Sequence, residues 1–183
     1  MSSNTPRDAQ SIELLRVALE TDLVLTGRQV EEFFGLDPRH PSFYNRDCYA
    51  APTKNAREVR VTFVAAQPEH LRLSTAAQRH LALTAEIRHA YGIEPDEWSV
   101  SADKESLEQP DAIWHRSTGE SVAIEIDVGT YSKERIVHKL LRYSSRYSGQ
   151  VWGTPSKKRL LKIASEIEAL GIKNVKLATL RFP

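Results

Sequence analysis

The clearest alternation of apolar and polar residues is in residues 121–128, SVAIEIDV. Successive side chains of a β-strand point to opposite faces of a sheet, so this run has one apolar and one acidic face. The apolar face holds Val122, Ile124, Ile126 and Val128. The other face holds Ala123, Glu125 and Asp127. We predict a strand whose two carboxylates need partners, because a buried charge without one is costly.

From residue 75 onward, helical and strand patterns alternate. A helix from Ser74 or Thr75 to Tyr91 is followed by a short strand and a hairpin, whose first strand opens at Asp111. The expected elements after the hairpin are helix 132–147, strand 150–153, helix 157–170 and strand 175–182. Hairpin strands followed by helical crossovers predict an α+β fold, with a mixed β-sheet flanked by helices.

Residues 9–34 predict two short helices joined by a tight turn. The second begins with a capping box, Thr26-x-x-Gln29, and ends at Gly35. Such a pair is typical of a helix-turn-helix or winged-helix module that docks on DNA, and also of two helices that cover a core. Residues 36–56 contain three prolines and no helical period, where a recognition helix should follow. Residues 57–66 predict a strand, as a wing or at a sheet edge.

Composition narrows the class of protein. Of the 183 residues, 40% are hydrophobic and 27% charged, as in ordinary globular proteins, and the formal net charge is +1. Binding to nucleic acid would therefore need a local basic patch. No apolar stretch approaches membrane-spanning length, and the single cysteine, Cys48, excludes an intrachain disulfide. We expect a cytoplasmic protein with no membrane partner.

The acidic face allows two interpretations. Glu125 and Asp127 are about 6–7 Å apart along a strand, and Asp111 can join them across the hairpin. Three converging carboxylates would bind Mg²⁺ or Mn²⁺, which prefer oxygen ligands. Alternatively, these carboxylates pair with lysines or arginines of a helix. Spacing alone leaves both interpretations open.

Basic residues follow the carboxylates. In the helix at 132–147, Arg135, Lys139, Arg142 and Arg146 recur at helical spacing and predict a basic ridge. The helix at 157–170 opens with Lys157, Lys158 and Arg159, a placement that opposes the helix dipole unless an anion binds there. These residues can hold phosphates, or they can form an ordinary solvated surface.

Pro110-Asp111, then Glu125-x-Asp127, then a helix with Lys139, resembles the PD-(D/E)xK nuclease superfamily, with its restriction endonuclease-like core. The resemblance implies that Asp111 and Glu125 hold a metal ion and that Glu86, on the first helix, assists. Asp127 stands where that superfamily has its lysine. Lys139 can take the lysine's place.

The chain is also similar to the replication-relaxation family of plasmids and mobile elements. The similar segments are LLRVALETDLVLTGRQVEEFF, HLALTAEIRHAY, PDAIW, VAIEIDVGT, KLLRY and VWGTPSKKRLLKIA. This resemblance implies a reduced winged-helix-like region at 1–68 and a nuclease-like core at 69–183. It also implies DNA as partner, with replication or mobilisation proteins or a second copy of the chain as further partners.

We therefore expect a DNA-binding protein, with Mg²⁺-dependent phosphodiester hydrolysis as its hypothesised activity. Asp111, Glu125 and Asp127 would hold the metal, and Lys139 would act at the phosphate. The alternative is a catalytically silent module with the same fold that binds DNA or another protein, and Asp127 in the lysine position favours it. A transcription regulator acting through residues 9–66 is a third interpretation.

Overall fold

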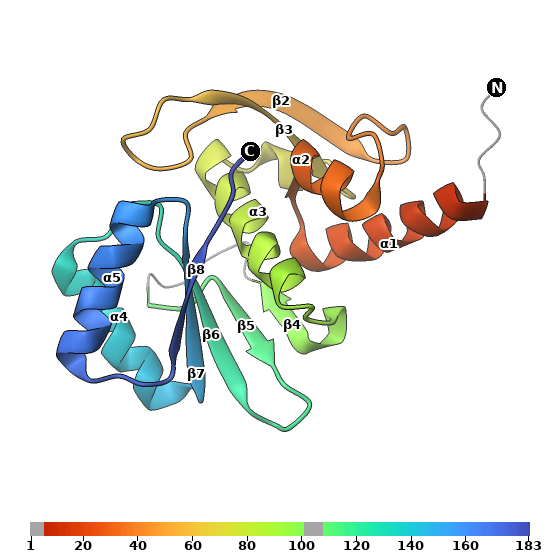
Figure 1. Cartoon of the computed structure of the whole chain (residues 1–183). Helices are drawn as coiled ribbons and strands as arrows, with labels where there is room; N and C mark the ends of the chain where they lie inside the picture. Colours follow the sequence, from red (N-terminus) through yellow and green to blue (C-terminus); the bar gives the residue numbers. More distant parts are fainter. Residues whose placement is uncertain (1–5, 101–107) are drawn as a thin grey trace.

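The computed structural model describes residues 6–100 and 108–183, and its elements form two β-sheets and five α-helices within these ranges (Figure 1). The first half contains α1 (Pro6–Asp22), β1 (Leu25–Thr26), α2 (Gly27–Gln29), a π-helical turn (Val30–Phe34), β2 (Tyr44–Ala50), β3 (Val59–Ala65), a 3-10 turn (His70–Arg72) and α3 (Thr75–Ala90). The second half contains a 3-10 turn (Pro95–Glu97), β4 (Trp98–Val100), β5 (Ala112–His115), β6 (Ser121–Ile126), α4 (Lys133–Arg146), β7 (Gly149–Thr154), α5 (Lys157–Leu170) and β8 (Val175–Thr179).

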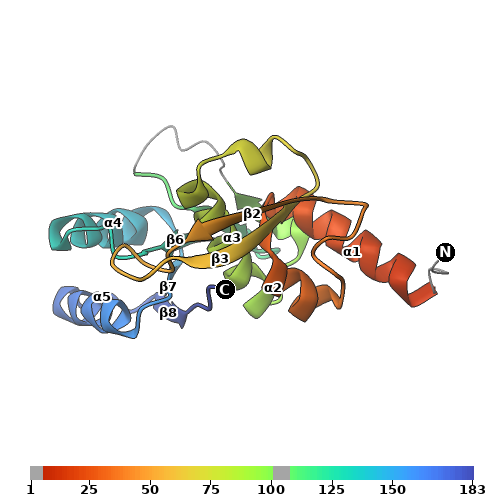
Figure 2. The ribbon, with the colours of Figure 1, turned by 90° about the horizontal axis from the view of Figure 1, so that it is seen from above.

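The larger sheet is mixed, with strand order β4-β5-β6-β7-β8. Strands β4, β5 and β6 pair antiparallel, whereas β6, β7 and β8 pair parallel through the crossover helices α4 and α5. Figure 2 shows α4 and α5 together on the side of this sheet away from α1. The predicted α+β fold, a mixed sheet flanked by helices, is confirmed.

Strand β6 has the two faces that its alternation predicts. Ile124 and Ile126 are fully buried in a cluster with Leu83 and Ile87 of α3. Ala123, on the other face, packs in a separate cluster with residues of α4 and α5. The strand is thus covered on both faces, which places its carboxylates inside the protein.

The smaller sheet, in the order β1-β3-β2, is antiparallel. The predicted capping box forms: the Thr26 hydroxyl accepts a hydrogen bond from the Gln29 backbone N–H, and the Gln29 side-chain oxygen accepts one from the Thr26 backbone N–H. Gly35 ends the following turn with φ of +68°, as the sequence predicts. One side of these elements is buried in a hydrophobic cluster that includes Leu19, Val30 and Val64. The two N-terminal helices therefore cover a core.

The strand predicted at residues 57–66 is confirmed as β3, and of its two predicted settings the sheet edge is wrong, because β3 is the central strand of its sheet. Strand β2 lies within residues 36–56, where the sequence predicted no strand. Within this segment the structure has turns and β2 in place of a recognition helix. The helix that a winged-helix module would place after the second helix is therefore absent from residues 36–56.

The loop between β2 and β3 extends across to the larger sheet (Figure 1). Lys54 N donates a 2.9 Å hydrogen bond to Val128 O, just beyond the end of β6. Phe63 of β3 also shares one hydrophobic cluster with Ile126 and Phe182. These contacts bring a loop from the first third of the chain to the carboxyl end of β6.

Candidate functional site

The Glu125 carboxylate is held inside the protein by three donors. Lys139 Nζ and the Tyr131 hydroxyl donate to Oε1 at 2.7 and 2.5 Å, and the Tyr143 hydroxyl donates to Oε2 at 2.8 Å. Glu125 and Lys139 are 0% and 1% exposed. The ion pair is therefore internal to the fold, and its tyrosine donors satisfy the carboxylate further.

Both tyrosines are kept in their neutral, donating form. Burial raises the pKa of Tyr131 and of Tyr143 far above the ordinary value of 10.0, and the negative charge of Glu125 raises each further. The Asp111 carboxylate acts in the same direction on both. A protonated tyrosine hydroxyl beside a carboxylate is a stable hydrogen-bond donor at neutral pH.

Asp127 and Asp111 have separate partners. Asp127 accepts from Gly129 N at 2.8 Å and from Arg159 Nε at 2.5 Å, and Arg159 also donates to Tyr131 O. Asp111 accepts from Ile126 N at 2.7 Å. Across the residues that the structure describes, no three His, Cys, Asp or Glu side chains gather as metal ligands.

This arrangement does not fit the expected Mg²⁺ or Mn²⁺ ion. Both Glu125 oxygens already accept hydrogen bonds, one of them from an ammonium, and a guanidinium neutralises Asp127. A divalent cation would have to displace Lys139 and Arg159 to use these oxygens. The alternative interpretation, carboxylates paired with basic side chains of the following helices, describes the contacts better.

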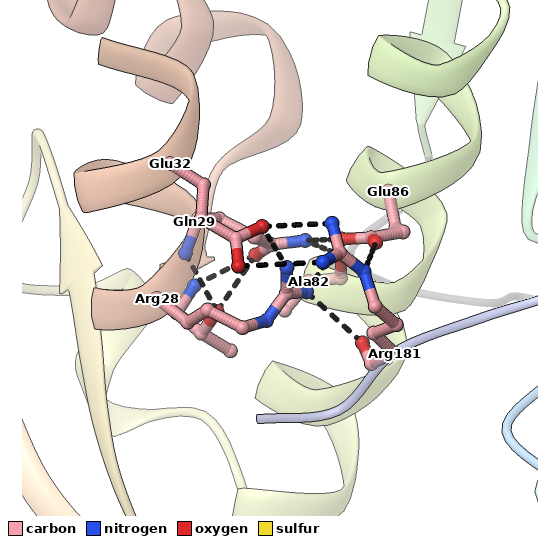
Figure 3. Close-up of polar contacts among 7 residues, drawn as sticks. Arg28, Gln29, Glu32, Ala82, Glu86 and Arg181 are labelled. Atoms are coloured by element: carbon pink, nitrogen blue, oxygen red, sulfur yellow. Dashed lines mark hydrogen bonds and ion pairs between the residues drawn. The ribbon is translucent and has the colours of Figure 1, made fainter. Parts of the chain in front are cut away.

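Glu86 belongs to a different network, drawn in Figure 3. Its Oε2 accepts from Arg28 Nη2 at 2.6 Å and from Gln29 Nε2 at 3.0 Å, and Arg181 Nε lies 3.5 Å from Oε1. The network joins α2, α3 and the tail after β8. Since α3 packs on the apolar face of β6, the structure does not bring Glu86 together with Glu125.

The basic ridge predicted on α4 is not a single surface. Lys139 lies on the buried side with Ile136, Leu140 and Tyr143. Arg142 Nη1 pairs with Glu108 Oε2 at 2.6 Å, and the Arg135 guanidinium lies 4.3 Å from the Tyr131 ring centroid. Arg146 is exposed. Lys139 therefore cannot serve, in this conformation, as part of a surface that contacts DNA.

A basic cavity of about 320 Å³ lies where the loop between β2 and β3 meets the start of α5. Three exposed lysines line it: Lys54, Lys158 and Lys162. In the described parts of the chain no carboxylate forms an ion pair with any of the three. Their positive charge is therefore available to a ligand.

The backbone around the cavity also favours an anion. The Ser156 hydroxyl caps α5 by accepting from Arg159 N at 3.2 Å, and the dipole of this 14-residue helix is positive at that end. Val128 and Gly129, which follow β6, form the opposite wall. The cavity thus lies at the carboxyl ends of the parallel strands β6 and β7, where α/β sheets commonly bind ligands.

The sequence indicated Lys158 and Arg159 as phosphate-binding residues but not the other two lysines of the cavity, Lys54 and Lys162. Lys162 is one helical turn after Lys158, and that spacing could have revealed it. Lys54 comes from a proline-containing loop and lies 67 residues before Ser121, the first residue of β6, so no local signal marks it. Tyr143 is not among the predicted site residues, and its position four residues after Lys139 is the signal that could have revealed it.

The replication-relaxation family matches residues 49–158, more than half of the 183-residue chain, so the protein belongs to that family. Comparison with curated proteins gives no match, and neither does comparison with solved structures. None of the described helices is both long and apolar enough to cross a membrane. Family membership indicates a role in replication or relaxation of plasmid or mobile-element DNA.

Proposed function

We propose that this protein binds DNA and holds its backbone phosphates in the basic cavity at the start of α5. The observation that carries the proposal is the convergence of Lys54, Lys158 and Lys162 on one cavity without carboxylate partners among the described residues. Phosphate contacts from lysines give affinity without base recognition. Replication or mobilisation proteins and a second copy of the chain are further proposed partners.

The absence of a recognition helix from the described N-terminal part supports this mode of binding. Without a helix to enter the major groove, contacts to the backbone are the main source of affinity. The near-neutral chain, with formal net charge +1, also requires that attraction to DNA come from a local concentration of cations. The basic cavity supplies one.

The test compares two charge-matched variants by fluorescence anisotropy with a labelled DNA duplex. The first replaces Lys54, Lys158 and Lys162 with Gln. The control replaces with Gln three exposed arginines that do not line the cavity: Arg16, Arg39 and Arg72. Three lost phosphate contacts of about 0.5–1 kcal/mol each should weaken binding about 10- to 150-fold in the first variant.

The control should keep the wild-type affinity within about twofold if the cavity is the binding site. The loss in the lysine variant should be the same for duplexes of unrelated sequence, because phosphates are common to all. Equal losses in both variants would show attraction by general charge and would remove the cavity from the proposal. Wild-type protein that binds no DNA at low salt would refute the function itself.

A metal-dependent DNA nuclease is the second candidate function. The direct contact of Lys139 Nζ with Glu125 Oε1 at 2.7 Å favours it, because the PD-(D/E)xK resemblance expects a lysine beside that carboxylate. The order of elements from α3 to β7, α-β-β-β-α-β, also agrees with that resemblance. Glu125 and Asp127 already accept hydrogen bonds from Lys139 and Arg159, which leaves no room for a divalent ion without rearrangement. For this reason we rank the nuclease below DNA binding without catalysis.

Nicking of supercoiled plasmid in Mg²⁺ or Mn²⁺ tests the nuclease. Asp111→Asn and Glu125→Gln keep the shape of each side chain and remove its charge, so loss of nicking in both would support catalysis. Wild-type protein that binds the plasmid but leaves it supercoiled would remove this candidate.

A further inference from the structure

A second cavity lies at the opposite end of the larger sheet, where β6, β7 and β8 begin. Its volume is about 230 Å³, and its lining includes Val122, the second residue of β6, and Gly149 and Val175, the first residues of β7 and β8. The basic cavity, in contrast, lies beyond the carboxyl ends of β6 and β7. The two cavities are therefore separate.

Aromatic and cationic side chains line this second cavity together. The Arg116 guanidinium lies 4.5 Å from the Trp114 ring centroid, and Lys176 Nζ lies 5.7 Å from the Tyr91 ring centroid. The Tyr91 and Trp114 ring centroids are 6.4 Å apart, and Lys173 also lines the cavity. An aromatic ring and a guanidinium plane are the two protein surfaces on which unpaired bases stack.

The charge of the lining also suits a nucleotide. Glu120 is the acidic residue that lines the cavity, and it pairs with Arg116 Nη1 at 3.2 Å. Lys173 and Lys176 are exposed, and in the described ranges neither has a carboxylate partner. Arg116 Nε is buried and has no hydrogen-bond partner there. The cavity therefore offers two ammonium groups without carboxylate partners among the described residues, beside its aromatic rings.

We infer that this cavity binds one unpaired nucleotide of a single DNA strand, with the base stacked at Trp114 and Arg116 and the phosphate at Lys173 and Lys176. The volume, about 230 Å³, is smaller than the roughly 300–1,000 Å³ of pockets for drug-sized ligands, which suits a single base. The inference rests on the proposed DNA binding and adds to it a substrate class, DNA with an unpaired segment.

Tryptophan fluorescence gives a direct readout of this site. The chain has three tryptophans, and Trp98 and Trp152 are buried. A base that stacks at Trp114 should therefore quench its emission selectively. Titration with a short oligothymidylate should quench wild-type fluorescence, and the Trp114→Phe variant should lose that quenching.

Affinity for the single strand is measured by anisotropy in two further variants. Trp114→Ala should bind it about 5- to 150-fold more weakly, the effect of losing one stacked base. Lys173→Gln with Lys176→Gln changes only exposed side chains and should also weaken it, about tenfold. Arg16→Gln with Arg39→Gln is the charge-matched control. If Trp114→Ala fails to fold, the double lysine variant and the fluorescence titration decide.

The outcomes separate this inference from the proposed function. A wild-type protein that binds duplex and single strand, with unchanged single-strand affinity in the cavity variants, would overturn the inference and leave DNA binding intact. Equal quenching by thymidine monophosphate at the same concentration would assign the cavity to free nucleotides and would also overturn it. Absence of any DNA binding would refute the proposed function. Quenching and affinity losses confined to the single strand would support the inference.

Discussion

Replacement of Lys139 with Met tests whether the buried ion pair supports the fold. The Lys139 side chain is 1% exposed, and its Nζ donates to Glu125 Oε1 at 2.7 Å, Tyr143 OH at 3.0 Å and Gln109 O at 3.4 Å. Methionine retains most of the aliphatic volume but removes the charge. Glu125 would then be a buried carboxylate with tyrosine donors and no counter-charge from Lys139. Removal of one partner from such a pair costs about 3–5 kcal/mol.

Urea unfolding followed by circular dichroism measures this cost. We expect Lys139→Met to lower the free energy of unfolding by about 3–5 kcal/mol, a large share of the roughly 5–15 kcal/mol typical of a domain. Lys162→Met, on the exposed surface of α5, is the matched control and should change it by no more than about 0.5 kcal/mol. The m-value should not change, because the same surface unfolds.

A second substitution tests the reason for the loss. Glu125→Gln removes the charge that Lys139 neutralises, so the double variant Lys139→Met/Glu125→Gln should recover part of the lost stability. The coupling energy between the two positions should exceed about 1 kcal/mol. A cost below about 1 kcal/mol for Lys139→Met, or strictly additive effects, would contradict the assignment of Lys139 as the counter-charge of Glu125.

Two further predictions concern the same sheet. The raised pKa values of Tyr131 and Tyr143 mean that both stay protonated in the folded protein when unfolded tyrosine, with its ordinary pKa of 10.0, loses its proton. The free energy of unfolding should therefore keep its full value below about pH 10 and decrease above it, by up to about 1.4 kcal/mol per pH unit for each tyrosine. In urea unfolding at high pH, Tyr131→Phe should show a smaller decrease than the wild type. Gly153→Ala should lower the free energy of unfolding by about 1–3 kcal/mol in the same assay. The reason is that the added Cβ would lie 2.7 Å from Leu180 Cδ1 and 2.8 Å from Ile87 Cδ1. An unchanged urea midpoint would contradict this prediction and show that both side chains move aside freely.

Local patterns were sufficient to predict the larger sheet and its helices. The helix predicted at 157–170 coincides with α5, and the alternation in 121–128 gives the two faces of β6. Strand β2 was missed because most of its side chains are exposed and polar. The hydrogen bonds between β2 and β3 hold β2 in its extended conformation. Such a long-range contact leaves no periodic signal in the sequence of β2 itself.

The candidate site could be predicted only in part. Lys139 is three residues after Ile136 and four before Tyr143, so helical spacing places it in the buried stripe, yet its charge suggested the surface. Whether a buried lysine is tolerated depends on Glu125, which lies on another element. The cavity lysine Lys54 depends on the hydrogen bond between its backbone N and Val128 O, a contact that the sequence does not show.

The salt dependence of duplex binding tests the central claim, phosphate binding by the basic cavity, most directly. Each lysine that contacts a phosphate adds about 0.9 to the slope of log K against log salt concentration. The variant with Gln at Lys54, Lys158 and Lys162 should therefore show a slope shallower than wild type by roughly 2 to 3, whereas the triple arginine control should retain the wild-type slope. An unchanged slope in the lysine variant would contradict the claim.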